Sequence, residues 1–359
     1  MRYFMDTYYR QNYAPIELKT YEIETYPPEH HLQDVPWIGA ALQVCQSTSL
    51  QMIAAQHQII RPRNYFDFLM GFTYGESNIE GAGFSPFGTD PETGFQTAAP
   101  YLGLARGYYV TNDQALYPKA LRAYLSKGYP IRVALDMGAL YGKKDFIAHS
   151  EVLVGYDLTG LYYYETVCLP PATCTPGEHP PGDPGIHVTD QQLLKAVASQ
   201  SKNLQYPWRY AFSIFEPGQM QQDTALLWSR NGQSMGQSSQ YGPKMGPAVI
   251  DDLAAKIEQQ GARFDLSKIR SGIALAVVLR KDNATYLREA YPNKPDLENA
   301  AALFVQAAAD YQAVQDAIQD GIADQAEADQ IAARLHDAAS AERKTGEIFI
   351  RYGDSRTTP

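Results

Sequence analysis

The chain has 359 residues, a hydrophobic content of 45% and a formal net charge of −10 at pH 7. This length exceeds what a single hydrophobic core usually holds, so we expect two domains, and the apolar content excludes a disordered chain. The acidic balance argues against a nucleic-acid-binding protein, because such a protein needs a basic stripe on its surface.

The N-terminal segment and the cysteines bear on where the protein works. Residues 1–24 contain no apolar core of signal-peptide length, and no segment reaches the roughly 18 apolar residues of a membrane span. We therefore expect a soluble, cytoplasmic protein without a membrane partner. Cys168 and Cys174 are close in sequence, but a disulfide between them would need an oxidising compartment.

The first predicted helix that carries chemistry begins at or just after Cys45, in the stretch VCQSTSLQMIAAQHQI. The first turn of a helix presents unpaired N–H groups and about half a positive charge, which lowers the pKa of a cysteine. A lone cysteine is also a common core residue, so Cys45 needs partners before it counts as a nucleophile. The capping residues of this helix are Ser47, Thr48 and Ser49, and its apolar positions are Leu50, Met52, Ile53 and Ala54.

Between this helix and residue 219 the sequence predicts strands, helices and loops. The glycine-rich stretch from Met70 to Asp90 suits either a structured loop beside a ligand or a surface connection. Its aromatic residues Tyr74, Phe84 and Phe87 are the candidates for contact with a substrate. The further elements are a helix over 117–130, a buried strand over 131–137, two strands over 149–167, a proline-rich loop over 168–187, a helix over 188–199 capped by Thr189, and a strand over 209–218.

The character of the sequence changes after residue 218. Residues 219–247 include the polar, glycine-rich stretch NGQSMGQSSQYGPKMGP, which is typical of a linker or mobile loop. Residues 248–359 are rich in alanine, leucine, glutamate and glutamine and predict several helices. We therefore expect an α+β protein with a mixed domain over 1–218 and an α-helical domain over 248–359.

A cysteine nucleophile needs a base that takes or holds its proton and a third polar group that orients the base. His149 and Glu165 follow Cys45 in the chain and lie on the two predicted strands of one hairpin. With a three-residue turn ending in a left-handed Gly160, odd-numbered residues of both strands share a face. That register still places Glu165 opposite Leu153, about 13 Å from His149 at roughly 3.3 Å per residue. A bulge or a bend has to bring the two side chains together.

Other interpretations of these residue types stay open. A histidine at a strand edge and a solvated strand carboxylate are both common. Four residues of the proline-rich region are zinc-ligand types, but they lack the tight Cys-x-x-Cys spacing of structural zinc sites, so we expect no metal. The adjacent His30 and His31 cannot easily share one metal from a strand and are expected at the surface. The four zinc-ligand types are Cys168, Cys174, His179 and His187.

The order of cysteine, histidine and acid, with a helix behind the cysteine and the hairpin HSEVLVGYD followed by YYYETV, resembles the papain-like clan. It is most similar to the bacterial group related to bacteriocin-processing peptidases, in which the histidine strand ends in Gly-Tyr-Asp. More narrowly, CQSTSLQMI, LDMGALYGKKDFIAHSEVLVGYD and the tail with VVLRKDNATYLREAY together resemble the butirosin biosynthesis protein H family, over residues of about 25 to 350. The resemblance implies a papain-like cysteine-peptidase fold followed by a helical domain.

The resemblance also implies an N-acyltransferase of specialised-metabolite biosynthesis rather than a protease. Cys45 would attack a thioester on the phosphopantetheine arm of an acyl carrier protein and form an acyl-enzyme. His149 would hold the thiolate and later deprotonate the attacking amine of a small molecule, and Glu165 would fix the imidazole tautomer. No bound cofactor is implied. Because water competes with the amine, the loops over 70–90 and 168–187 are candidates for covering the site.

Two positions depart from the papain-like pattern. Gly39 stands where a glutamine commonly completes the oxyanion hole, so Gln43 becomes the candidate donor beside the backbone N–H of Cys45. Glu165 stands where aspartate or asparagine is usual, and its longer side chain requires a matching shift of the backbone.

Three classes of function stay open. A cysteine peptidase or amidase uses the same nucleophile machinery, with water instead of an amine resolving the acyl-enzyme. A non-catalytic binding protein could keep the fold.

The helical domain could dock a carrier protein, form a homo-oligomer or cap the site, and its basic pairs would suit an acidic carrier protein. These pairs are Arg280 with Lys281 and Arg288 with Lys294.

Overall fold

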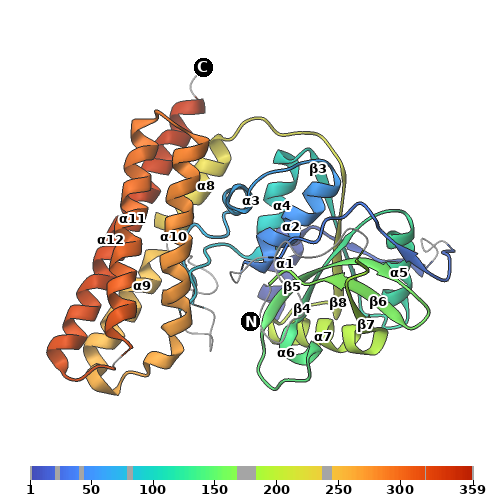
Figure 1. Cartoon of the computed structure of the whole chain (residues 1–359), viewed down its shortest axis with the longest axis horizontal. Helices are drawn as coiled ribbons and strands as arrows, with labels where there is room; N and C mark the ends of the chain where they lie inside the picture. Colours follow the sequence, from blue (N-terminus) through green and yellow to red (C-terminus); the bar gives the residue numbers. More distant parts are fainter. Residues whose placement is uncertain are drawn as a thin grey trace. The chain divides into compact units, whose positions relative to one another are not determined.

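The structure is a computed structural model of the chain (Figure 1). It describes residues 2–20, 25–39, 44–78, 84–167, 183–236, 245–319 and 321–357. The chain divides into two compact units, one of Met1–Phe66 with Phe95–Gln221 and the other of Asp67–Gly94 with Gln222–Pro359. The first unit holds a sheet with helices and the second is helical, so the expected mixture of α and β structure with a helical C-terminal region is confirmed.

The units differ from the predicted boundaries in two places. Residues 67–94, expected within the first domain, belong to the helical unit. The expected linker over 219–247 contains helix α8 (Ala225–Gly236), whose Trp228 side chain is fully buried. Helix α8 packs on α12 (Gln325–Thr357), so part of the polar sequence that suggested a linker is an amphipathic helix.

A sheet forms the centre of the first unit, with the strand order β1-β3-β8-β4-β5-β6-β7 and with β2 paired to β5 outside this order. Strand β1 is parallel to β3, and the other described pairs are antiparallel. The described strands are β1 (Pro15–Glu17), β2 (His30–His31), β3 (Leu104–Thr111), β4 (Ile131–Asp136), β5 (Ala148–Tyr156), β6 (Gly160–Tyr164), β7 (Ile186–Thr189) and β8 (Tyr210–Pro217). Strand β5 is buried from its second residue onward, so polar side chains on it need an explanation.

Helices cover this sheet. Helices α2 (Cys45–Gln56) and α5 (Leu116–Ser126) pack against β5, and α7 (Asp190–Asn203) packs along β4 and β8 (Figure 1). Thr189 caps α7 in a capping box with Gln192, as the sequence predicts. The other helices with residues in this unit are α1 (Arg2–Tyr13), α3 (Arg63–Met70), α4 (Pro91–Tyr101) and α6 (Met137–Leu140).

The helical unit consists of helices that lie side by side (Figure 1). Their apolar faces meet in one core that includes Ile257, Ile273, Tyr311 and Leu335, all fully buried. None of the described helices combines the length and the apolar character needed to span a membrane. Besides α8 and α12, the unit contains α9 (Pro247–Gln260), α10 (Arg270–Ala290), α11 (Pro295–Ala317) and two short 3-10 turns, Gly261–Arg263 and Leu266–Lys268.

A buried charge network ties residues 67–94 to helix α10. Arg280 has no exposed surface and pairs with both Glu76 and Glu342. Its Nη1 also donates to the carbonyl of Thr73 at 2.7 Å. Arg280 is therefore a structural anchor, and its predicted place on a basic docking surface is wrong.

Candidate active site

Helix α2 places Cys45 at its first residue, as the sequence predicts. The first intrahelical hydrogen bond runs from the N–H of Thr48 to the carbonyl of Val44, so the preceding N–H groups have no acceptor within the helix. The hydroxyls of Ser47, Thr48 and Ser49, expected to cap this end, instead donate to carbonyls of the preceding turn. The uncapped amides therefore favour a negative charge beside Cys45.

The turn of the β5–β6 hairpin is tighter than expected. The N–H of Asp157 donates to the carbonyl of Gly160, so only Leu158 and Thr159 form the loop. The carboxylate of Asp157 accepts hydrogen bonds from Thr159 and from the N–H of Gly160, and these bonds hold its pKa well below the ordinary value. Gly160 does not adopt the expected left-handed conformation. Glycine is required there because a Cβ would lie 2.1 Å from the carbonyl oxygen of Val188 on β7.

A bulge at Val154 shifts the register of the hairpin by one further residue. On the side of the turn Gly155 pairs with Tyr162, whereas beyond the bulge Leu153 pairs with Tyr163. The extra residue on β5 therefore lets the two strands slip past each other by one position.

The short turn and the bulge together move Glu165 by two residues, from the level of Leu153 to the level of Glu151. A shift of two keeps its side chain on the same face as His149, whereas a shift of one would turn it to the opposite face. The bulge that the sequence analysis required is therefore present.

His149 and Glu165 form a direct hydrogen bond inside the unit. His149 Nε2 donates to Glu165 Oε1 at 2.6 Å, and both side chains are buried. The same oxygen accepts from the N–H of Val167 at 3.1 Å, and Oε2 accepts from the hydroxyl of Tyr141 at 3.0 Å. Burial opposes ionisation of Glu165, but the hydrogen bond and the charge of His149 hold its pKa below the ordinary value. The indole of Trp37 donates to the backbone carbonyl of Glu165 at 2.9 Å.

The side chain of His149 also interacts with Cys45. Because Nε2 faces carboxylate oxygens, Nδ1 is the nitrogen that remains for the thiol. Burial by itself lowers the pKa of His149, but the charges of Glu151 and Cys45, and hydrogen bonds with both, raise it well above the ordinary value. His149 therefore holds its proton to a higher pH than an ordinary histidine does.

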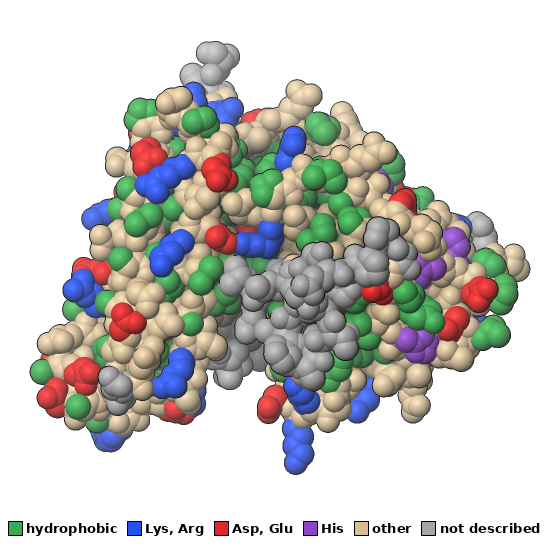
Figure 2. Space-filling model, in the orientation of Figure 1, with side chains coloured by type: hydrophobic (Ala, Val, Ile, Leu, Met, Phe, Trp, Pro, Cys, Tyr) green, Lys and Arg blue, Asp and Glu red, His purple; other side chains and the backbone are tan. Residues whose placement is uncertain are grey.

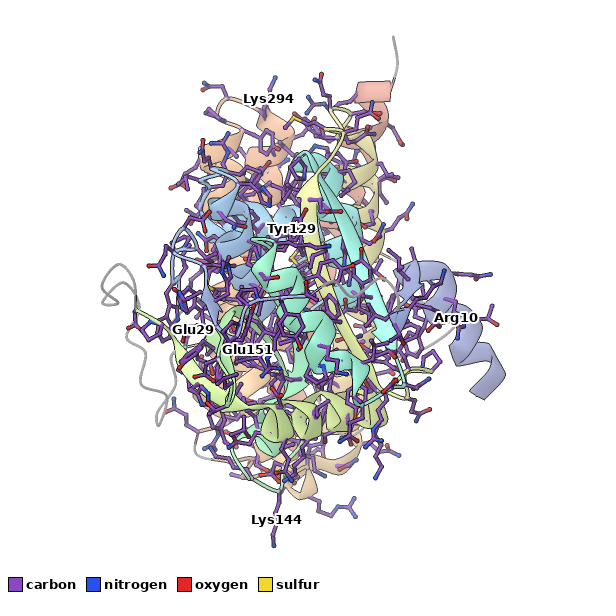
Figure 3. All side chains as sticks on the ribbon, turned by 90° about the vertical axis from the view of Figure 1, so that its right-hand side faces the viewer. Arg10, Glu29, Tyr129, Lys144, Glu151 and Lys294 are labelled. Carbon is purple, nitrogen blue, oxygen red and sulfur yellow. The ribbon has the colours of Figure 1, made fainter. Side chains whose placement is uncertain are left out.

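Glu151 is a member of the site that the sequence analysis missed. It follows His149 by two residues on β5, and its side chain has no exposed surface. Its Oε1 lies 3.0 Å from His149 Nε2. Figure 3 shows Glu151 within the sheet unit, whereas Lys144 of the preceding loop extends away from the ribbon. Strand alternation was the signal that could have found Glu151, because residues i and i+2 share a face.

Cys45 is the most accessible member of the predicted triad. Cys45 is 8% exposed, against 3% for His149 and 1% for Glu165. The residues just before β5 include the exposed apolar side chains of Phe146 and Ile147. All three members of the predicted triad are thus buried or nearly so.

The buried cluster also has the donor types of a metal site. Donor atoms of His149, Glu151 and Glu165 lie within 4.8 Å of one another. The 2.6 Å separation of His149 Nε2 and Glu165 Oε1 is a hydrogen-bond distance and leaves no space for an ion between these two atoms. His187, one of the residues considered as a zinc ligand, lies 3.0 Å from the hydroxyl of Thr159 instead.

Several predicted residues lie outside the described part of the chain. The predicted oxyanion role of Gln43, the expected absence of a zinc site and the open question whether two cysteines pair are therefore untested. His30 and His31 form β2 and are half-buried rather than free at the surface. The residues outside the described ranges are Gln43, Cys168, Cys174 and His179.

The aromatic residues expected on a substrate loop lie in the helical unit instead. Tyr74 and Phe84 are buried, so they are core residues and the substrate role predicted for them is wrong. Phe87 is half-buried. The glycine-rich stretch was ambiguous because its aromatic residues suit a core as well as a binding loop. Their ring partners are Phe304 and Phe349 for Tyr74, Tyr311 for Phe84, and Phe72 for Phe87.

In the second basic pair, Arg288 with Lys294, the charge of Arg288 is partly balanced. Arg288 forms an exposed ion pair with Glu298 at 2.8 Å. On the face drawn in Figure 2, Lys and Arg side chains alternate with Asp and Glu over the described helices of this unit. A mixed surface of this kind does not select an acidic partner by charge.

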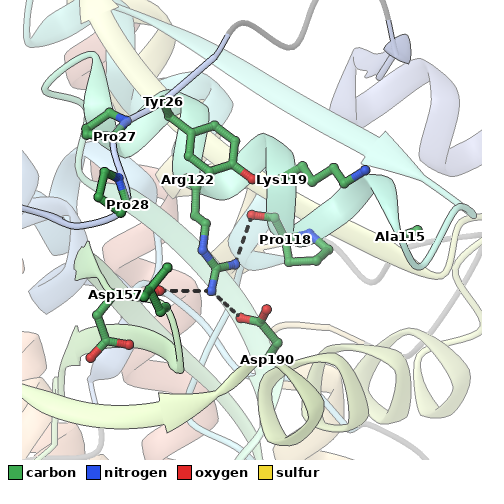
Figure 4. A pocket seen from close by; sticks show the side chains of 10 residues that line it. Tyr26, Pro27, Pro28, Ala115, Pro118, Lys119, Arg122, Asp157 and Asp190 are labelled. Atoms are coloured by element: carbon green, nitrogen blue, oxygen red, sulfur yellow. Dashed lines mark hydrogen bonds and ion pairs between the residues drawn. The ribbon is translucent and has the colours of Figure 1, made fainter.

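A surface pocket of about 530 Å³ lies near the hairpin turn (Figure 4). Arg122 lies in it and donates to the carbonyls of Asp157 and Gly160 and to the carboxylate of Asp190. Since this guanidinium has structural partners and the pocket contains no member of the predicted triad, we do not assign the pocket to the active site. Its lining residues are Tyr26, Pro27, Pro28, Ala115, Pro118, Lys119, Arg122, Asp157, Leu158 and Asp190.

The sequence matches no protein-family model and no curated protein. The chemistry inferred for the site therefore depends on its geometry. A cysteine at a helix N-terminus is followed in the site by a buried histidine, which is hydrogen-bonded to a buried carboxylate.

Proposed function

We propose that the chain is a cysteine-dependent acyltransferase that forms an amide bond. The observation that carries the proposal is the run of contacts from Cys45 at the start of α2, through His149, to Glu165. Covalent acyl transfer requires a nucleophile, a base and an orienting acid in this order. A buried histidine and carboxylate destabilise a core relative to apolar residues of the same size, which favours a functional reason for them.

In the first half-reaction the Cys45 thiolate attacks the carbonyl carbon of an acyl thioester. A C–S bond forms to Cys45, the C–S bond to the donor thiol breaks, and the proton held by His149 passes to the departing thiolate. The backbone N–H of Cys45 and the uncapped amides of α2 would stabilise the charge that develops on the carbonyl oxygen. Glu165 holds the imidazole in one orientation throughout.

In the second half-reaction an amine attacks the acyl-enzyme. His149, now neutral, accepts a proton from the amine as the C–N bond forms and the C–S bond to Cys45 breaks. The products are the amide and the original pair of thiolate and imidazolium. Water in place of the amine would give hydrolysis, so the site has to position the amine and exclude water.

The papain-like fold and the kinship with the butirosin biosynthesis protein H family are part of the same proposal. The motifs around Cys45 and His149 support them, together with the antiparallel strands β4, β5 and β6 beside the helix that bears the cysteine. The resemblance is also what favours an amine over water, a carrier-bound pantetheine thioester as donor, and a cytoplasmic pathway of specialised metabolism.

Intact-mass spectrometry tests the proposal. The protein and Cys45→Ala are each incubated with a panel of acyl-pantetheine thioesters. We expect a mass increase equal to the acyl group, absent from the variant and discharged faster by amines than by water. Discharge by water alone would establish a hydrolase instead. No adduct with any donor, together with slow iodoacetamide labelling of Cys45, would overturn the proposal in favour of a binding protein.

The other two cysteines provide matched controls for this experiment. Cys168→Ala and Cys174→Ala remove the remaining thiols of the chain one at a time. Both variants should keep the acyl adduct, because the proposal assigns the nucleophile to Cys45 alone. Loss of the adduct in either of them would relocate the nucleophile.

A further inference from the structure

Glu151 and Glu165 are buried carboxyl groups at the same level of two paired strands, but their surroundings differ. Glu165 accepts hydrogen bonds from His149, Val167 and Tyr141. Among the described residues, neither oxygen of Glu151 has a hydrogen-bond partner of good geometry, although Oε1 lies 3.0 Å from His149 Nε2. The three donors favour an ionised carboxylate at Glu165, whereas no donor stabilises a negative charge on Glu151 in this way.

Two ionised carboxylates are unfavourable in this position. Like charges side by side in a buried site cause one of the two groups to keep its proton. The Nε2–H of His149 cannot serve both acids, because it points at Glu165 over 2.6 Å. A proton on Glu151 removes the repulsion and at the same time supplies a donor.

We propose that Glu151 is a positioning residue that keeps a proton and shares it with Glu165, so that the charged triad works beside a neutral carboxylic acid. The two acids then have different roles. Glu165 orients and balances the imidazolium, whereas Glu151 fills the space beside the imidazole and fixes the Glu165 carboxylate without adding a second negative charge. The inference rests on the proposed function only in taking Cys45 as the nucleophile.

The groups that face Glu151 are consistent with this assignment. Burial and the charge of Glu165 raise the pKa of Glu151 well above its ordinary value, against the opposing effect of His149. Its neighbour on β4 is the apolar Val133. Glu151 therefore keeps its proton to a higher pH than an ordinary glutamic acid does. The titratable groups around it are His149 on β5, Glu165 after β6, Tyr163 on β6 and Tyr141 after α6.

Two substitutions test whether Glu151 acts as a neutral acid or as an anion. Glu151→Gln keeps the shape of the protonated acid but cannot become an anion. Glu151→Asp keeps the carboxyl group but shortens the side chain by one methylene group. The readout is the second-order rate of Cys45 alkylation by iodoacetamide as a function of pH, which needs no acyl donor. At pH 7 we expect Glu151→Gln to stay within about threefold of the wild type and Glu151→Asp to lose about tenfold.

The shape of the pH profile adds a second criterion. The wild-type rate should change again as the pH rises through the raised pKa of Glu151, and Glu151→Gln should lack that step. A loss of more than about tenfold in folded Glu151→Gln would mean that Glu151 acts as an anion and would overturn the inference. A stoichiometric metal ion in the purified protein that is lost in Glu151→Gln would overturn it as well.

Infrared spectroscopy tests the protonation state even if Cys45 proves unreactive. At neutral pH the wild type and Cys45→Ala should both show the carbonyl stretch of a protonated carboxylic acid, part of which disappears in Glu151→Gln. Glu76 is a second buried carboxyl group with a raised pKa, so Glu76→Gln identifies its share of the band. If the band belongs wholly to Glu76, the inference fails; if Cys45 is inert and the Glu151 band is present, only the proposed function fails.

Discussion

His149 and Glu165 are 16 residues apart in the chain, and their side chains meet at 2.6 Å. They meet because the strand pairing is shifted by two residues relative to a regular hairpin with a three-residue turn. The two-residue turn accounts for a shift of one residue, and the bulge at Val154 accounts for the second. Either change alone would turn Glu165 to the opposite face of the sheet. The predicted triad therefore depends on backbone irregularities as much as on the identity of its side chains.

Glu165→Gln tests the acid directly. The amide cannot balance an imidazolium and permits the wrong tautomer, so we expect acyl transfer and Cys45 alkylation to slow by about 10² to 10⁴-fold. Glu17→Gln is the control, because Glu17 is an exposed acid of the same unit. An equal effect of both substitutions would exclude a specific role for Glu165.

The pH dependence of stability should report the His149 imidazolium. Its pKa in the folded state is raised above the ordinary value of about 6.5, so the stabilisation is fully present below that pH and is lost as pH rises through the folded pKa. The difference in Tm between the wild type and His149→Gln should therefore be largest below about pH 6.5 and shrink as the pH rises through the folded pKa of His149. Differential scanning fluorimetry measures it, and a difference that grows with pH would contradict the prediction.

Arg280→Met should destabilise the helical unit strongly. The substitution leaves Glu76 and Glu342 buried without their cation, and breaking a buried pair in this way costs about 3 to 5 kcal/mol. Urea denaturation measures the change in the free energy of unfolding. Arg288→Met, which breaks the exposed pair with Glu298, should have a far smaller effect. Similar effects of the two variants would argue against the anchoring role.

A fragment ending at residue 218 should not fold as an independent domain. Residues 67–94 belong to the helical unit, so the fragment would expose side chains such as Tyr74 and Phe84 that are buried in the full chain. We expect aggregation or loss of the thermal transition, measured by size-exclusion chromatography and circular dichroism. A matched fragment in which a short linker replaces residues 67–94 is the control. A monomeric, cooperatively folding 1–218 fragment would show that the segment is dispensable.

The sequence alone determined the features that depend on neighbouring residues. Helical spacing and residue type located the start of α2 at Cys45, apolar content located β4, and the cap of α7 was identified at Thr189. The order of cysteine, histidine and acid also singled out the residues that the structure brings together. Such patterns are local, because backbone hydrogen bonding and side-chain periodicity repeat over a few residues.

Tertiary structure decided the register of the β5–β6 hairpin, the inclusion of Glu151 in the site and the transfer of residues 67–94 to the helical unit. Each of these outcomes depends on contacts between residues far apart in the chain, such as Arg280 with Glu76. A glycine-rich aromatic stretch suits a loop or a core equally well until its partners are known. The free energy that selects between such states comes from burial and pairing, which sequence periodicity does not encode.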